Sequence, residues 1–292
     1  MIYVICGPTG SGKTNAAKAL SDIFEAPIIN ADAFQIYKDM DIGTAKISKK
    51  DPYYKKHYLL DIKKPNETFS VKEYQTLFRQ KIGDLQEKYQ NIIVCGGTGL
   101  YIKASLYDYV FDEEDEELES HEFDNLSNEE LYNKLLSVDK EAANKIHMNN
   151  RKRIIRALNI ASRGKTKSEI IDSQEHKLIY PHVRFLMINP NREELYENIN
   201  QRVDKMFALG LEEEVKSLLN KYDLSLTAKA AIGYKEVIDY LNGQMSLDDC
   251  KELIKKRSRN YAKRQVTFFK NQFPIEYYSS NDELVIKMRE ER

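Results

Sequence analysis

The stretch that decides the fold lies at the N-terminus and reads IYVICGPTGSGKT, residues 2–14. Residues 2–6 form a short apolar run with several β-branched side chains, which predicts a buried strand. Apolar residues at helical spacing over 13–24 predict a helix directly after the glycines. Between them, residues 7–14 satisfy the pattern GxxxxGK[ST] in full. The strand, loop and helix together are the context that a phosphate-binding loop, or P-loop, requires.

This glycine loop predicts a site for a diphosphate or triphosphate, and it does not distinguish ATP from a smaller ligand. Its glycines let successive N–H groups point at an anion, and the positive end of the helix dipole adds to the attraction. Lys13 would supply a point charge, and the Thr14 hydroxyl would bind Mg²⁺. A chance glycine turn is the alternative. The expected binding residues are Gly7, Pro8, Thr9, Gly10, Ser11, Gly12, Lys13 and Thr14.

Strand and helix patterns continue to alternate after the loop. Strands are expected at 27–29, 91–95 and 182–188, and a helix with an apolar face at 71–89. Such alternation implies βαβ units and a parallel sheet. The expected fold class is therefore α/β, with a P-loop NTPase-like parallel sheet core flanked by helices. The remainder of the chain is expected to be helical, with helices at 192–209, 212–221, 234–241 and 247–269.

Only helical signals occur in the middle of the chain. Residues 112–122 hold eight acidic side chains and no Lys or Arg, and Ser127 with Glu130 fits a capping box. We therefore expect a helical insertion domain. Three parts would result, namely the first part of the core at 1–111, the insertion at 112–180, and the return to the core with the C-terminal helices at 181–292.

Asp32 is the best candidate for a functional carboxylate. A P-loop ATPase needs an acid near its phosphate site, but the strand at 91–95 ends in glycines, and Asp61 follows only a short apolar run. Asp32 follows the second strand, at the carboxyl edge where open α/β sheets bind ligands. The alternative is that Asp32 caps a helix starting at Ala33.

A second glycine loop, GGTGLY at residues 96–101, also ends a strand and begins a helix. Glycines there could serve only for tight packing. Because the loop falls at the same sheet edge as the P-loop, we interpret it as a second wall of the site, with Thr98 as its polar group.

The charge of the chain is balanced overall but separated along the sequence. Lys and Arg number 45 against 46 Asp and Glu, a net charge of −1 that excludes a uniformly basic protein. Residues 151–167 nevertheless carry seven Lys and Arg without an acid, and 251–271 carry eight against Glu252 alone. Solvated helix faces usually mix signs, so two one-sided blocks favour contacts with the phosphates of a structured RNA.

Cysteine usage and hydropathy point to a cytoplasmic protein. The three cysteines are far apart and form no CxxC pair, which predicts neither a zinc site nor a disulfide framework. The N-terminus lacks the pattern of a signal peptide, and no apolar stretch approaches the about 18 residues of a membrane-spanning helix. We expect no membrane association.

Several segments, in order along the chain, resemble the tRNA dimethylallyltransferases, also called tRNA isopentenyltransferases or the IPP transferase family. MDIGTAK at 40–46 and YAKRQ at 261–265 are highly specific. The sequence departs from the family pattern at His147-Met148, at Gly164-Lys165-Thr166 and at Thr267-Phe268-Phe269. The other matching segments are residues 7–14, DAFQIY at 32–37, HYLLD at 57–61, GGTGLY at 96–101, RIIRAL at 153–158 and IGYKE at 232–236.

The resemblance implies an enzyme that transfers a dimethylallyl group from dimethylallyl diphosphate to N6 of the adenosine 3′ of the anticodon in tRNA. Asp32 would accept the N6 proton, and Thr98 would line the same channel. Arg202 and Lys13 would hold the diphosphate, and Mg²⁺ would be the cofactor. The implied catalytic residues are Asp32, Thr98, Lys13 and Arg202.

The resemblance also implies that the insertion domain and the C-terminal basic block hold the anticodon stem-loop, without a protein partner. A small-molecule or nucleoside kinase is the main alternative, because it also combines a P-loop with an acid after the second strand. A non-catalytic RNA-binding module is a third, disfavoured by intact Lys13 and Thr14. The implied tRNA contacts are Asp32, Ala33, Phe34, Gln35, Arg151, Lys152, Arg153, Arg257, Lys263, Arg264 and Gln265.

Overall fold

A computed structural model of the protein describes residues 1–111, 123, 125–162, 164, 166, 168–169 and 176–292. The chain divides into two compact units, the first formed by Met1–Leu106 with Tyr180–Arg292 and the second by Tyr107–Ile179. The sequence predicted an insertion over 112–180. The acidic stretch 112–122 lies outside the described residues.

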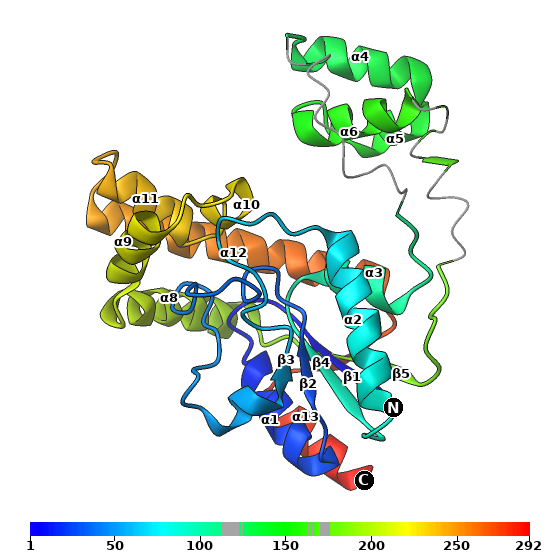
Figure 1. Ribbon diagram of the computed structural model, residues 1–292, viewed down its shortest axis with the longest axis vertical. Helices are drawn as coiled ribbons and strands as arrows, with labels where there is room; N and C mark the ends of the chain where they lie inside the picture. The colour runs from blue at the N-terminus through cyan, green and yellow to red at the C-terminus, as the bar shows by residue number, and fades with distance from the viewer. Residues whose placement is uncertain (112–122, 124, 163, 165, 167, 170–175) are drawn as a thin grey trace. The chain divides into compact units, whose positions relative to one another are not determined.

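Six strands of the described chain form one parallel sheet in the first unit, in the order β3-β2-β4-β1-β5-β6 (Figure 1). The predicted α/β class with a parallel core is therefore confirmed. β1 is central, and its Ile5 pairs with Cys95 of β4 and Leu186 of β5. The strands are β1 Ile2–Cys6, β2 Ile28–Asn30, β3 His57–Tyr58, β4 Ile92–Cys95, β5 Val183–Ile188 and β6 Ile275–Tyr278.

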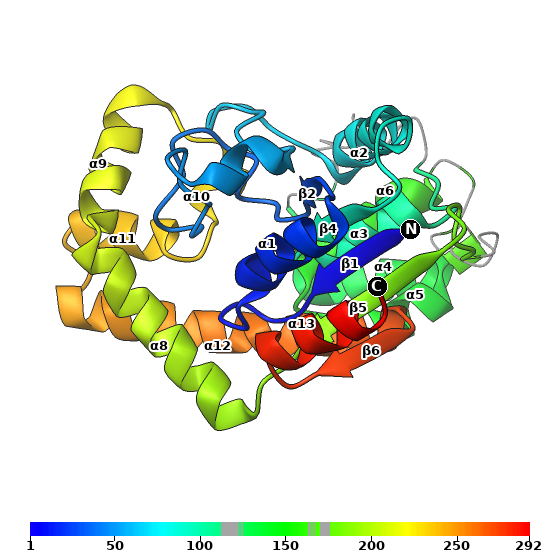
Figure 2. The same ribbon diagram turned by 90° about the horizontal axis from the view of Figure 1, so that it is seen from below.

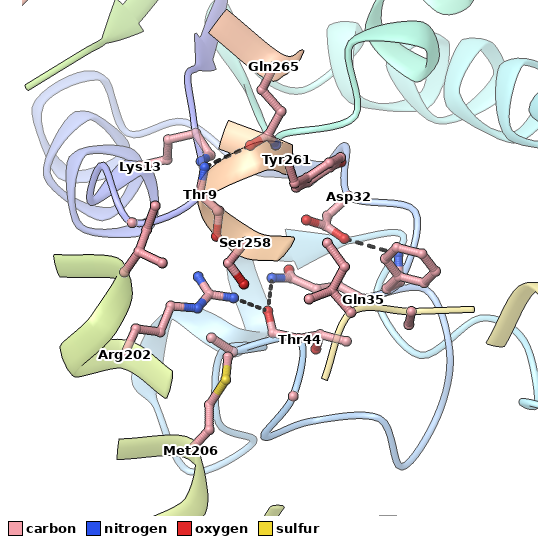
Figure 3. A pocket seen from close by; sticks show the side chains of 18 of the residues that line it. Thr9, Lys13, Asp32, Gln35, Thr44, Arg202, Met206, Ser258, Tyr261 and Gln265 are labelled. Carbon is pink, nitrogen blue, oxygen red and sulfur yellow. Dashed lines mark hydrogen bonds between the residues drawn. The ribbon is translucent and has the colours of Figure 1, made fainter. Parts of the chain in front are cut away.

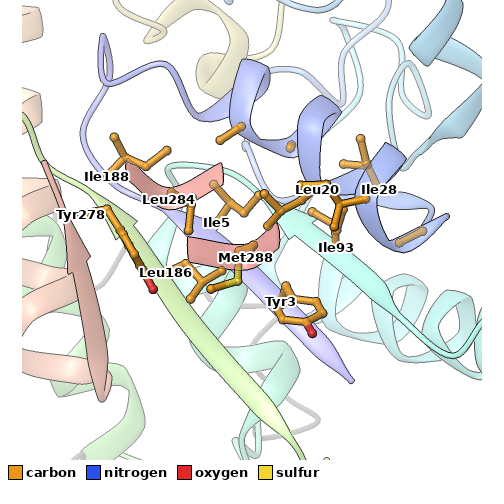
Figure 4. Close-up of a cluster of buried hydrophobic side chains, with 14 residues drawn as sticks. Tyr3, Ile5, Leu20, Ile28, Ile93, Leu186, Ile188, Tyr278, Leu284 and Met288 are labelled. Atoms are coloured by element: carbon orange, nitrogen blue, oxygen red, sulfur yellow. The ribbon is translucent and has the colours of Figure 1, made fainter. Parts of the chain in front are cut away.

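Two helices, α1 (Lys13–Phe24) and α13 (Asn281–Glu290), lie side by side on one face of this sheet (Figure 1, Figure 2). Alternate strand residues such as Ile5 and Leu186 meet Leu20 of α1 and Met288 of α13 in a buried apolar cluster (Figure 4). Burial of these side chains holds the strand that leads into the P-loop.

The opposite side of the sheet is associated with α2 (Val71–Gln86) and α3 (Gly99–Leu106), which pack on each other. Tyr74 of α2 is fully buried, and its hydroxyl donates to the carbonyl of Asn30 at the end of β2 (2.8 Å). Phe185 of β5 stacks on Phe273, with ring centroids 4.8 Å apart. These contacts fix the strand ends at which the loops begin.

The C-terminal third is mostly helical, as predicted, and several of its helices begin at capping side chains. Asn191, Ser246 and Ser280 each accept an N–H of the first turn of α8, α12 and α13. No helix among the described residues is long and apolar enough to cross a membrane. The further elements are η1 Pro52–Lys56, α8 Arg192–Ala208, α9 Leu211–Lys221, α10 Leu226–Lys229, α11 Tyr234–Leu241 and α12 Leu247–Gln272.

The strand β6 was missed, because it lies beyond the last helix that the sequence predicts, which ends at residue 269. Ile275–Tyr278 pairs with β5 as a parallel edge strand, with Phe185 opposite Ile275. Four residues are too few to show a period in the sequence, and their strand conformation depends on pairing with a strand about 90 residues earlier.

The second unit contains α4 (Asn128–Val138), α5 (Lys140–Lys145) and α6 (Arg151–Ala161). Leu131 and Leu135 of α4 and Ile154 of α6 are fully buried in its own apolar core. The predicted capping box is confirmed, since Ser127 and Glu130 exchange their side-chain and backbone hydrogen bonds.

Candidate active site

A cavity of about 500 Å³ lies within the first unit, where β1, β2 and β4 end (Figure 3). The P-loop, Asp32 and Arg202 provide polar groups to its lining. Apolar side chains from α8, including Val203 and Met206, line it too. The cavity is therefore located at the sheet edge where open α/β folds bind ligands.

The P-loop backbone has the curvature that the sequence predicted. Gly10 and Gly12 have φ values of 83° and 85°, in the left-handed region that favours glycine. A Cβ on Gly7 would lie 2.4 Å from the carbonyl oxygen of Ile188, so only glycine permits this approach. Of the eight predicted residues, Gly7, Pro8 and Ser11 are buried in support of the loop. The cavity is lined by Thr9, Gly10, Gly12, Lys13 and Thr14.

Lys13 is the cation of this loop. Its Nζ donates to the carbonyl oxygen of Pro8 (2.7 Å). Burial lowers the pKa of Lys13 to about 8, nearby Arg202 acts in the same direction, and Asp32 opposes the shift. The charge of this lysine therefore depends on pH within an experimentally accessible range.

Asp32 lies at the cavity just beyond the end of β2. Its N–H donates to Oδ1 of Asn30 (3.2 Å), and its Oδ1 accepts the N–H of Phe34 (3.0 Å). The segment that follows forms a turn, so the alternative that Asp32 caps a helix beginning at Ala33 is wrong. These hydrogen bonds hold the carboxylate at the cavity (Figure 3).

Thr98 forms hydrogen bonds with the segment that carries Asp32. Its Oγ1 accepts the N–H of Ala33 (3.0 Å), and its own N–H donates to the carbonyl of Ala31 (3.1 Å). The approach is close, because a Cβ on Gly96 would lie 2.1 Å from the same carbonyl. Of the described residues that line the cavity, Cys95 and Gly96 belong to this region and Thr98 does not, so Thr98 supports the Asp32 turn and is not the polar wall of the site that the sequence predicted.

Gln265 of α12 joins the two glycine loops. Its Oε1 accepts the N–H of Thr9 (2.8 Å), and its Nε2 donates to the carbonyl of Gly97 (2.9 Å). The residue is only 5% exposed. Both ends of the amide are thus engaged inside the protein, which favours a supporting role over the tRNA contact predicted from the sequence.

Arg202 of α8 extends into the cavity (Figure 3). Its Nη2 donates to the carbonyl oxygen of Thr44 (3.3 Å), which also accepts Nε2 of Gln35 (3.1 Å). Burial lowers the pKa of Arg202, and the charge of Asp32 opposes that shift. Lys13, Arg202 and Asp32 are therefore lining residues of one cavity, although they are far apart in the sequence.

A family model described as IPP transferase matches residues 35–272 of this sequence. The chain belongs to the IPP transferase family. It is 42% identical over 290 residues to the tRNA dimethylallyltransferase of Anoxybacillus flavithermus, covering 99% of this chain and 93% of the relative. It is likewise 42% identical over 283 residues to the tRNA dimethylallyltransferase of Bacillus subtilis, covering 95% and 90%.

Solved structures of IPP transferases resemble this one. The tRNA delta(2)-isopentenylpyrophosphate transferase of Staphylococcus epidermidis superposes with a TM-score of 0.71 at 35% identity, covering 99% of this chain and 97% of its own. A eukaryotic dimethylallyltransferase, described as acting on tRNA, superposes with a TM-score of 0.80 at 28% identity, covering 96% and 74%.

In this IPP transferase, the predicted tRNA-contact residues of the first unit other than Asp32, Ala33 and Gln265 fall into two groups. Phe34, Gln35 and Arg264 line the cavity, and Lys263 is exposed on α12. The guanidinium of Arg264 lies over the Tyr261 ring, 5.6 Å from its centroid. Arg264 therefore combines a place at the cavity lining with an exposed position on α12, and Lys263 is its exposed neighbour.

Arg257 belongs to the second group, because it forms an ion pair with Glu236. The Glu236 side chain is only 1% exposed, and its Oε2 also accepts the N–H of Gly233 at the start of α11 (2.6 Å). Arg257 therefore neutralises a buried carboxylate, a role that the sequence did not reveal.

In the second unit of this IPP transferase, Lys152 and Arg153 are exposed on α6. Arg151 instead donates to the carbonyl oxygens of Leu126 (2.5 Å) and Phe123 (2.7 Å). Its guanidinium thus satisfies backbone groups that precede α4, whereas its two neighbours have their charges in solvent.

Sequence reasoning missed several residues of the IPP transferase site. Thr44 and Ser258 line the cavity, and Glu214 of α9 contacts the segment that carries Thr44. Thr44 falls within the MDIGTAK segment, so the resemblance contained a signal for it. Glu214 stands in an acidic first helical turn, a common pattern that gave no such signal.

Proposed function

We propose that this protein transfers a dimethylallyl group from dimethylallyl diphosphate to N6 of the adenosine 3′ of the anticodon in tRNA. The supporting observation is a single cavity lined by a P-loop, a half-buried arginine and a carboxylate. The P-loop and Arg202 suit a diphosphate leaving group, and Asp32 suits a base for the incoming amine. The membership of the IPP transferase family agrees with this reaction rather than with a kinase.

The reaction is a nucleophilic substitution at the allylic carbon. The nitrogen N6 forms a bond to C1 of the dimethylallyl group while the bond from C1 to the diphosphate oxygen breaks. Asp32 accepts the proton that N6 loses, and diphosphate leaves with the electron pair of the broken bond. Lys13, Arg202 and the N–H groups of the P-loop stabilise the negative charge that develops on the leaving group.

We also propose that a magnesium ion arrives with the diphosphate and is held at this cavity. Among the described residues, no group of three or more His, Cys, Asp or Glu side chains is arranged to hold a metal. Mg²⁺ commonly relies on one or two protein oxygens together with substrate phosphates, and the Thr14 hydroxyl and the Asp32 carboxylate line the cavity. When bound there, the ion neutralises charge on the diphosphate.

The acceptor adenine must leave its stack to reach this cavity, as in other enzymes that modify a base. Phe34 and Tyr261 line the cavity, and aromatic rings of this kind stack on unpaired bases. Lys263 and Arg264 on α12, and Lys152 and Arg153 on α6, are exposed cations for the phosphates of the anticodon stem-loop.

One assay tests the proposal. The purified protein is incubated with unmodified tRNA, Mg²⁺ and dimethylallyl diphosphate that carries a label in the five-carbon group. We expect the label in tRNA at the adenosine 3′ of the anticodon, together with stoichiometric release of diphosphate. Phosphate transfer from ATP to a small acceptor, without label in tRNA, would instead favour the kinase.

A further inference from the structure

The backbone turn at residues 40–46 contributes one carbonyl group to the cavity. The carbonyl oxygen of Thr44 accepts Nη2 of Arg202 (3.3 Å) and Nε2 of Gln35 (3.1 Å). The Thr44 hydroxyl donates back to the carbonyl of Met40 (2.7 Å), which closes the turn. The direction of the Arg202 guanidinium therefore depends on where this turn lies.

Glu214 of α9 holds the turn from outside the cavity. Its Oε2 accepts the N–H groups of Asp41 (3.1 Å) and Ile42 (2.7 Å), and its Oε1 accepts that of Gly43 (3.2 Å). The hydroxyl of Tyr234 donates to the same Oε1 (2.6 Å). One carboxylate thus receives four hydrogen bonds, and bonds to an ionised acceptor are stronger than bonds between neutral groups.

The turn is packed closely against this anchor. A Cβ on Gly43 would lie 2.5 Å from Cε2 of the Tyr234 ring, so the backbone rests directly on that ring. On its other side, the buried Nζ of Lys46 donates to the carbonyl of Tyr37 (2.6 Å) and to Asp61 (2.7 Å). Glu214 thus holds the three residues that directly precede Thr44, and Lys46 holds the end of the turn that follows it.

We propose that Glu214 is a positioning residue, which acts through the turn and the Thr44 carbonyl to orient Arg202 toward the diphosphate. This inference rests on the proposed function for the identity of the anion. It assigns Glu214 no contact with substrate. If the inference is right, replacing Glu214 weakens anion binding in protein that retains Arg202 and has little effect in protein that lacks it.

The test uses Glu214→Gln, which keeps the size of the side chain and removes its charge and one acceptor. The dissociation constant for inorganic diphosphate with Mg²⁺ is measured by calorimetry on the full chain. We expect binding to weaken by about tenfold or more, because Arg202 loses an oriented, charge-assisted interaction. Glu213→Gln is the matched control, because it removes an exposed carboxylate one position earlier. It should bind diphosphate as the unchanged protein does.

A double-mutant cycle with Arg202→Lys separates positioning from simple stabilisation. If Glu214 acts through Arg202, Glu214→Gln should weaken diphosphate binding much less in the Arg202→Lys background. Additive losses, or unchanged affinity in folded Glu214→Gln, would overturn the inference. If Glu214→Gln does not fold, Tyr234→Phe decides. This variant removes one hydrogen-bond donor to Glu214. We expect a smaller loss of affinity for diphosphate, again only in protein that retains Arg202. Unchanged affinity for diphosphate would count against the inference.

Failure of this inference can be told from failure of the proposed function. If the unchanged protein transfers the dimethylallyl group to tRNA and Glu214→Gln binds diphosphate normally, only the role of Glu214 is wrong. If the unchanged protein transfers no label to tRNA, the proposed function is wrong. If Glu214→Gln still weakened diphosphate binding in that case, Glu214 would position Arg202 in an anion site that serves another reaction.

Discussion

The position of Asp32 is set by neighbours that are close to it in the sequence and by one that is distant. Its own turn is fixed by Asn30 and Phe34, and the following N–H is held by Thr98 from the second glycine loop. The carboxylate is thereby held in the cavity that Lys13 and Arg202 also line. Preorganisation of this kind is what an acid–base group needs before substrate arrives.

Replacing Asp32 with Asn should affect turnover more than tRNA binding. The amide oxygen of Asn can still accept the N–H of Phe34, so the turn is retained, but the side chain no longer accepts a proton. We expect single-turnover transfer to fall by about 10²–10⁴-fold, with the dissociation constant for tRNA nearly unchanged. Rapid-quench kinetics and filter binding measure the two quantities. Near-normal transfer by this variant would remove Asp32 from the mechanism.

The pKa of Lys13 predicts a pH dependence for the free enzyme. Burial lowers this pKa to about 8, so the ammonium loses its charge as the pH rises through that value. We expect kcat/KM for dimethylallyl diphosphate to fall above about pH 8, because kcat/KM reports the ionisation of the free enzyme. A steady-state profile from pH 6 to 9.5 measures this limb. A profile that stays level to pH 9.5 would contradict the assignment of Lys13.

At the scale of elements, α12 both supports the site and lines it. Its side chains include Gln265, which joins the two glycine loops, and Ser258 and Tyr261, which line the cavity. Its Arg257 pairs with the buried Glu236 of α11. The basic block that the sequence assigned to RNA is therefore divided between internal support and an exposed cationic surface.

Gln265→Leu should destabilise the protein without removing a direct contact to tRNA. The variant leaves the Thr9 N–H and the Gly97 carbonyl without their partner, and each unpaired buried group costs about 1–3 kcal/mol. We expect the free energy of unfolding in urea to fall by about 2 kcal/mol or more. Lys270→Leu, an exposed change on the same helix, is the control. Equal stability of both variants would refute the supporting role of Gln265.

Arg257 and Lys263 should behave differently although both lie in the same basic block. Arg257→Ala leaves Glu236 buried without its cation and should lower the free energy of unfolding by about 1–3 kcal/mol, with little effect on the salt dependence of tRNA binding. Lys263→Ala should reduce the slope of log K against log salt by about 1, without loss of stability. Denaturation and filter binding at several salt concentrations distinguish the two. A reduced salt slope for Arg257→Ala would restore its predicted RNA contact.

The second unit should contribute to tRNA binding without contributing to the diphosphate site. Lys152 and Arg153 are exposed on α6, whereas every residue that lines the cavity belongs to the first unit. The double variant Lys152→Gln, Arg153→Gln should weaken tRNA binding, reduce its salt slope by about 2, and leave the affinity for inorganic diphosphate unchanged. Lys134→Gln, another exposed cation of this unit, is the control. An unchanged salt slope in the double variant would exclude these residues from the RNA interface.

The parts of the molecule that could be predicted are those specified by interactions between residues close to each other in the sequence. The strand, glycine loop and helix at the N-terminus and the Ser127–Glu130 capping box are encoded within a few residues, and the conformations of both were predicted correctly. The short edge strand β6 and the anchoring of Gly43 by Glu214 depend on partners about 90 and 171 residues away. No local pattern indicates such partners, and a lysine or arginine looks the same in sequence whether it faces solvent or a buried carboxylate.

The central position of β1 has a consequence for the order in which the chain folds. β1 pairs with β4 on one side and with β5 on the other, and the residues of the second unit are synthesised between these two strands. At typical ribosomal rates, the nascent chain waits roughly 5 to 20 s after β4 emerges before β5 is available. The helices α4 to α6 make contacts within their own unit and can form during that interval. The second unit can therefore fold while β1 still presents an unpaired edge, and an exposed strand edge of this kind can pair with other chains until β5 covers it.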